Sequence, residues 1–173
     1  MESGRPYFLL VTAREVYAGP VTFPPDFLEA VLVRSTSHTS RLHGIAHWQR
    51  VLDHGREIAA ETEGADARVV LFFALFHDSM RLNDGHDPDH GRRGSALARE
   101  LAGVLPLERS QLDQLTAACD GHTDGLVSDD PTVGACWDAD RLDLPRVGIQ
   151  PDARLLSTAA ARARATLLVR CRP

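Results

Sequence analysis

The pair His77-Asp78 follows directly on a run of eight apolar residues, Val69 to Phe76. Such a run is typical of a helix that is buried on all sides. Two ionisable side chains at its end need compensation for the loss of solvent. A divalent metal ion supplies that compensation, because neutral imidazole and carboxylate are both good ligands. The alternative is a helix that simply reaches solvent at His77.

Two further residues favour the metal. His47 lies in the stretch HWQRV and Asp140 in DADRLD, and both stretches are expected to be helical. With His77 and Asp78 they form an ordered set of two imidazoles and two carboxylates. This set suits a hard-to-borderline divalent ion that keeps open positions for water and substrate. Helical bundles build metal sites from inward-facing side chains in this way.

The elements that must position these residues are predicted from apolar spacing and helix start signals. The expected helices cover residues 24–34, 42–60, 69–78, 94–105, 108–119 and 131–142, with a last one from Pro151-Asp152. Residues 35–40 and 81–90 are polar loops, and residues 7–12 form either a short strand or a packed arm. The prediction is one all-α domain over residues 1–173. Its core spans about 26–145, between an N-terminal arm, 1–25, and a C-terminal helix, about 151–170.

The amino-acid composition argues against several classes of function. The net charge of −5 argues against a nonspecific nucleic-acid binder. All 19 basic residues are arginine, so lysine Schiff-base chemistry is excluded. Three widely spaced cysteines and the lack of a membrane-length apolar run or signal peptide predict a cytoplasmic protein without a membrane partner.

The four-residue order resembles the HD superfamily of metal-dependent phosphohydrolases. The similarity rests on His77-Asp78, on RV three residues after His47, and on ADRL at Asp140, and it covers roughly residues 42–145. It implies an HD-domain helical bundle with a metal site in its core, ligated by His47, His77, Asp78 and Asp140. Asp138 is then expected near the ligands or at the surface, and Asp143 on a helix surface.

A second layer is similar to binuclear HD proteins. The stretch His90 to Ser95 is similar to their H-x-x-x-G-A element, and His122 stands where they carry another histidine. If both match, Asp78 bridges two ions. Such sets occur in HD-GYP-type phosphodiesterases and in di-iron oxygenases related to myo-inositol oxygenase. Here the GYP element is absent and the gap from Asp78 to His90 is short, so both one and two ions stay open.

A phosphate substrate needs cationic partners, which only arginine can supply in this chain. The expected substrate-binding residues follow the HD pair or precede His47: Arg81, Arg92, Arg93, His86 and His43. Each has an alternative. His43 could be an extra ligand or a packing residue, and His86 could be solvated. Arg50 and Arg141 are interpreted as structural ion pairs.

Together these observations predict a metal-dependent phosphohydrolase that uses metal-activated water on a small, nucleotide-like phosphoester. The expected cofactor is one or two divalent ions, Fe, Mn, Mg, Zn, Co or Ni. Asp78 is the expected catalytic residue, with Asp84 as another group that could orient the water. The rivals are a di-iron oxygenase and a non-catalytic ligand-binding module. No nucleic-acid polymer is expected as a partner, and the sequence does not indicate an oligomeric state.

Overall fold

A computed structural model describes residues 23, 25–124 and 126–170, and every regular element among them is helical. The prediction of an all-α fold is therefore confirmed. The segment 7–12 lies outside the described residues. The α-helices are α1 (Pro25–Arg34), α2 (Ile45–Glu61), α3 (Ala67–Phe76), α4 (His90–Glu100), α5 (Arg109–Gly121), α6 (Pro131–Leu142) and α7 (Ala159–Arg170). Two 3₁₀ turns, η1 (Leu144–Val147) and η2 (Ala153–Leu155), precede α7.

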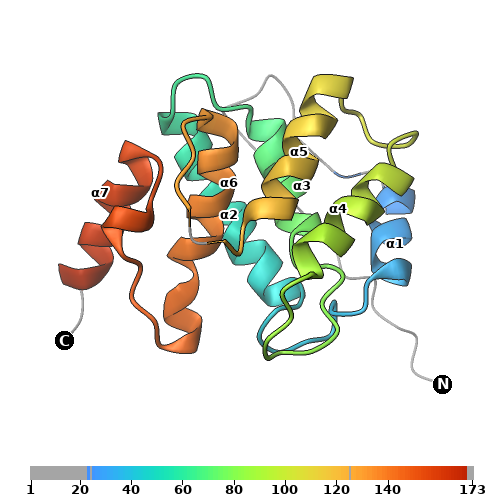
Figure 1. The fold of residues 1–173 in the computed structure, drawn as a ribbon, viewed down its shortest axis with the longest axis horizontal. Coiled ribbons are helices and arrows are strands. Elements are labelled where there is room, and N and C mark those ends of the chain that lie inside the picture. The colour runs from blue at the N-terminus through green and yellow to red at the C-terminus, as the bar shows by residue number, and fades with distance from the viewer. Residues whose placement is uncertain (1–22, 24, 125, 171–173) are drawn as a thin grey trace.

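Helix α3 is the centre of the bundle. It packs against α2, α4, α5 and α6, while α7 lies beside α6 at one edge (Figure 1). Every residue from Val69 to Phe76 is buried, as the apolar run predicts. Phe27 of α1 covers its outer side through an edge-on contact with Phe72 and a tilted contact with Phe76. None of the described helices is long and apolar enough to cross a membrane.

Several helix boundaries differ from those expected. Helix α2 begins at Ile45 rather than at residue 42, because residues 41–44 form a turn in which Gly44 approaches the carbonyl oxygen of Ser40. Helix α4 begins at His90, four residues early, and ends at Glu100 rather than at residue 105. Helix α7 begins only at Ala159, after the η2 turn.

The late start of α7 has a local cause. The buried carboxylate of Asp138 accepts the backbone N–H groups of Ser157 and Thr158, at 2.8 and 2.7 Å. These bonds hold the chain extended in front of the helix. Asp152, which was expected to begin the helix, caps only the 3₁₀ turn η2.

Two glycines let α4 approach its neighbours closely. A Cβ at Gly94 would overlap the carbonyl oxygen of Phe76, and one at Gly91 would overlap the carbonyl oxygen of Cys119. The backbone of α4 therefore lies directly on the ends of α3 and α5. This close approach places His90 beside the HD pair.

The polar loop 35–40 holds the turn that follows α3. The hydroxyl of Ser35 donates to the carbonyl of Ser79 and the hydroxyl of Ser37 to that of Asp78, both at 2.7 Å. The backbone N–H of Thr36 adds a third bond between these segments, to the carbonyl of Ser79 at 3.1 Å. These bonds fix the backbone from which His77 and Asp78 project.

The packing of α4 predicts the effect of a single methyl group. Gly94→Ala should lower the free energy of unfolding by about 1–3 kcal/mol, since the added Cβ overlaps backbone that cannot move aside freely. Gly103→Ala is the matched control, because a Cβ there meets no atom within 4 Å. Denaturant unfolding of both variants tests this, and equal stabilities would show that α4 is not tightly fitted.

Candidate metal centre

Four histidines in the bundle share one arrangement: Nδ1 faces an oxygen acceptor, which leaves the Nε2 lone pair free. The Nδ1 contacts are His47 to Asp143 Oδ2 at 2.7 Å, His77 to the carbonyls of Phe73 and Ala74 at 3.2 Å each, His90 to the carbonyl of Asp87 at 2.5 Å, and His122 to the carbonyl of Cys119 at 2.8 Å. A carbonyl or carboxylate oxygen only accepts, so we assign the ring hydrogen to Nδ1. This is the usual arrangement behind metal-ligating histidines.

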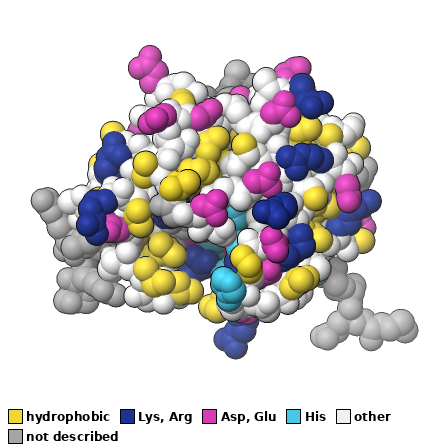
Figure 2. Space-filling view, in the orientation of Figure 1, with side chains coloured by type: hydrophobic (Ala, Val, Ile, Leu, Met, Phe, Trp, Pro, Cys, Tyr) yellow, Lys and Arg dark blue, Asp and Glu magenta, His cyan; other side chains and the backbone are white. Residues whose placement is uncertain are grey.

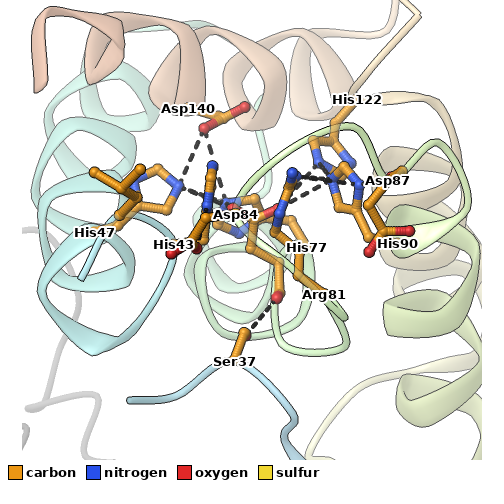
Figure 3. A network of polar contacts seen from close by, with 12 residues as sticks. Ser37, His43, His47, His77, Arg81, Asp84, Asp87, His90, His122 and Asp140 are labelled. Carbon is orange, nitrogen blue, oxygen red and sulfur yellow. Dashed lines mark hydrogen bonds and ion pairs between the residues drawn. The ribbon is translucent and has the colours of Figure 1, made fainter. Parts of the chain in front are cut away.

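The first pair of lone pairs converges on two carboxylates. Nε2 of His47 lies 3.0 Å from Nε2 of His77. Asp78 Oδ2 lies 3.4 and 3.7 Å from these two nitrogens, and Asp140 Oδ1 lies 3.3 and 3.8 Å from them. These groups come from α2, α6 and the turn after α3 (Figure 3). Their spacing is suited to one shared cation.

The second pair converges on the other oxygen of Asp78. Nε2 of His90 and Nε2 of His122 lie 2.8 Å apart, and Asp78 Oδ1 lies 3.0 and 3.7 Å from them. His90 begins α4, and His122 caps α5. Asp78 thus lies between two positions, with one oxygen directed at each. Both three-residue groups, His47-His77-Asp78 and Asp78-His90-His122, are compact enough to hold an ion.

The chemistry of this donor set fits metal ions. All six groups are hydrogen-bond acceptors in the assigned tautomers, and two lone pairs 3 Å apart cannot bond each other. The four imidazoles and Asp78 are buried, so water does not compensate them. Figure 2 shows some histidine atoms partly covered by other side chains near the centre of this face, above one histidine that lies at the surface. Asp140 is the most open ligand, with 20% of its side chain exposed.

The electrostatics of the cluster favour added positive charge. Burial acts to lower the pKa of His47, but the carboxylates of Asp140, Asp143 and Asp78 outweigh it and raise this pKa to about 10. Without metal, a proton therefore occupies Nε2 of His47 near neutral pH, and a bound ion would take its place. Burial lowers the pKa of His77 to about 3. The neighbouring imidazoles hold the pKa of Asp78 well below its usual range despite its burial. The carboxylates therefore stay ionised, and their field attracts a cation.

Asp143 lies behind the first position and not on the helix surface, which corrects the sequence-based expectation. It is buried, its Oδ2 accepts the Nδ1 hydrogen of His47, and its Oδ1 accepts Nε of Arg50 at 2.7 Å. The three-residue step from Asp140 keeps both aspartates on one side of α6, a signal that could have identified it. Asp138 is also buried, but it holds the chain before α7.

Two of the expected substrate residues lie at the centre. The ring of His43 packs edge-on against that of His47, with 6.2 Å between centroids. Its Nδ1 lies 3.0 Å from Asp84 Oδ1, which also accepts the hydroxyl of Ser40 at 2.5 Å. Burial lowers the pKa of His43, although the contact with Asp84 opposes this. Arg81 faces the second position, with Nη1 3.6 Å from Asp78 Oδ1.

The other three expected substrate residues are not brought to the centre. Arg92 is 79% exposed and lies 3.3 Å from Asp89. Arg93 donates to both oxygens of Asp87 and to the carbonyl of Met80. Arg93 lies three residues after His90, on the same side of α4, but its guanidinium is held by Asp87 and Met80. Both arginines stabilise the loop and the helix start. His86 is exposed, as expected for a solvated loop histidine.

Comparison with known proteins supports the fold and the class of site. No protein-family profile matches the sequence, and no curated protein does. A crystal structure of a predicted HD superfamily hydrolase from an uncultured Thermotogales bacterium matches with a TM-score of 0.63. It is 26% identical, and the match covers 83% of this chain and 85% of that one. The chain has the HD-domain fold with a histidine-aspartate cluster that fits an HD metal site, so the resemblance seen in the sequence is confirmed.

Because Asp78 lies between the two positions, its loss should affect both, whereas the loss of His122 should affect only the second. Asp78→Ala should remove all bound metal, because it deletes a ligand from both positions, while helical circular dichroism is retained. His122→Ala should lower occupancy of the second position only. Elemental analysis after reconstitution measures this, with the exposed Asp89→Ala as control. Full metal occupancy in Asp78→Ala would disprove the assignment.

The carboxylate behind His47 should tune the affinity of the first position. Asp143→Asn keeps the shape of the side chain but removes its charge, and loss of such outer partners typically weakens metal binding about 10–100-fold. Competition with a chromophoric chelator measures the affinity. Asp53→Asn, an exposed change on α2, is the control and should bind metal normally. Equal affinity in both variants would leave Asp143 a purely structural role.

Proposed function

We propose that this protein is a metal-dependent phosphohydrolase that acts on a small, nucleotide-like phosphoester. The observation that carries the proposal is the convergence of four free Nε2 lone pairs and two carboxylates on two adjacent positions. A binding module without turnover has no need of so many buried acceptors. The similarity to a predicted HD superfamily hydrolase supports the hydrolase class.

His47, His77, Asp78 and Asp140 would hold the first ion, and Asp78, His90 and His122 the second. When bound, such ions lower the pKa of coordinated water and polarise a phosphoryl oxygen. Two imidazoles at each position favour a transition metal such as iron, manganese, cobalt, nickel or zinc over magnesium, which prefers oxygen ligands.

The remaining roles in the proposed reaction fall to three side chains near the centre. Both oxygens of Asp78 are directed at imidazoles, so its catalytic role is to hold the centre together rather than to act as a free base. Asp84 orients His43 beside the first position. Arg81 supplies a guanidinium next to the centre, where it can attract the phosphate of a substrate. The reaction adds water across a P–O bond and releases an alcohol and phosphate.

The setting proposed for this activity is the cytoplasm, with a small phosphorylated substrate as the partner. Cys119 and Cys136 are both buried free thiols, which is typical of a reducing compartment. The formal charge of −5 disfavours a nucleic-acid polymer as the substrate.

A di-iron oxygenase is the second candidate, because the structure contains the two additional histidines that a second iron would require. His90 and His122 meet at the second oxygen of Asp78, which would bridge two irons. Oxygen consumption by the iron-loaded protein distinguishes the two functions. Uptake of oxygen without phosphate release would favour the oxygenase.

The test of the proposed function is phosphate release. Protein loaded with manganese, cobalt or iron should release phosphate from members of a panel of nucleoside monophosphates and simple phosphomonoesters. Asp140→Ala should abolish the release, since it deletes a ligand of the first position. Removal of the metal by a chelator should have the same effect, reversible on adding metal. If no substrate of the panel is hydrolysed with any of these metals, phosphoester hydrolysis is excluded.

A further inference from the structure

Arg81 lies against the second position. Its Nη1 is 3.1 Å from Nε2 and 3.2 Å from Nδ1 of His90, and 3.6 Å from Asp78 Oδ1. Figure 3 shows Arg81 among the residues of the cluster, and only 11% of its side chain is exposed. A guanidinium is always charged, so a fixed positive charge stands beside two of the three groups that form this position.

The contact leaves the metal-binding lone pair open. Nearly equal distances to the two ring nitrogens put Nη1 against the ring of His90 and not on the line of the Nε2 lone pair. The rest of the guanidinium is anchored, because Nη2 donates to the carbonyl of Gly85 at 2.7 Å and Nε to that of Asn83 at 3.3 Å. An ion can therefore reach His90, but only beside a cation that is held in place.

Apart from Asp78, which is itself part of the second position, the nearby acids do not cancel this charge. The carboxylate of Asp87 is paired with Arg93 through both oxygens. Asp84 has 48% of its side chain exposed, and one of its oxygens already contacts Ser40 and His43. Solvent screens an exposed carboxylate much more than a buried guanidinium.

The two positions differ in the charged groups that surround them. The first position has Asp140 to itself in addition to its share of Asp78, whereas the second position has only its share of Asp78. Asp143 behind His47 adds to this difference, although its other oxygen is paired with Arg50. The inequality between the two positions therefore comes from Asp140 and Asp143 on one side and Arg81 on the other.

We propose that Arg81 is the resident cation of the second position and sets how many ions the centre holds. The first position binds its ion tightly, and the second binds a weak, exchangeable ion. This rests on the metal centre of the proposed function, but it concerns the number of ions rather than the reaction. A unit charge a few ångströms from a buried divalent ion is expected to change its affinity at least tenfold.

The test is titration of the metal-free protein with Mn(II), followed by electron paramagnetic resonance, which counts free and bound ions. Wild-type protein should bind one ion tightly and a second at least tenfold more weakly. In Arg81→Gln the second affinity should rise at least tenfold, and coupling between two Mn(II) ions should appear at stoichiometric metal. The first affinity should change little. Arg81→Lys keeps a charge and should stay weak at the second position.

Arg92→Gln is the matched control, because it removes the same charge from an exposed site nearby and should alter neither affinity. Two ions of equal affinity in wild-type protein would overturn the proposal, even if Arg81→Gln failed to fold. A folded Arg81→Gln with an unchanged second affinity would overturn it too, while leaving the proposed hydrolase intact. If no ion binds to either protein, the metal centre itself fails.

Discussion

The fixed tautomer of four buried imidazoles is the constraint on which the centre depends. Three of the rings donate their Nδ1 hydrogen to backbone carbonyls, and His47 donates to Asp143. His77 uses the carbonyls of Phe73 and Ala74 near the end of α3, of which that of Phe73 also accepts the backbone N–H of His77. These bonds fix the orientation of the ring. The Nε2 lone pairs are then committed to one small volume, which only cations can stabilise.

The rest of the fold fixes the distances between the candidate ligands. Helix α4 approaches α3 and α5 through Gly91 and Gly94, and this brings His90 to His122. The loop before α2 binds the turn after α3 through the hydroxyls of Ser35 and Ser37. Close backbone packing and hydrogen bonds to main-chain groups make the ligand positions insensitive to side-chain motion at the surface. A metal site with short ligand distances requires this rigidity.

Residue types and periodicity explain how much of this could be predicted. The buried run of α3, the all-α class and the HD pattern follow from apolar spacing and from motifs within single segments. The meeting of His90 with His122 could not be settled in this way, because distance along the chain does not give distance in space. Arg92 and Arg93 were expected to bind substrate, but Arg92 lies at the surface beside Asp89 and Arg93 is held by Asp87, contacts that the order of residues along the chain does not show. The role of the 35–40 loop was missed since its hydroxyls bind distant backbone.

X-ray absorption spectroscopy of the zinc-loaded protein tests the central claim most directly, because it reports ligand types without relying on activity. The account predicts a first shell of nitrogen and oxygen at about 2.0–2.2 Å, with the multiple-scattering signature of imidazole. Asp78→Ala should remove this signal. A shell of sulfur at about 2.3 Å, or an oxygen shell without imidazole, would contradict the claim that His47, His77, His90 and His122 are built to bind metal.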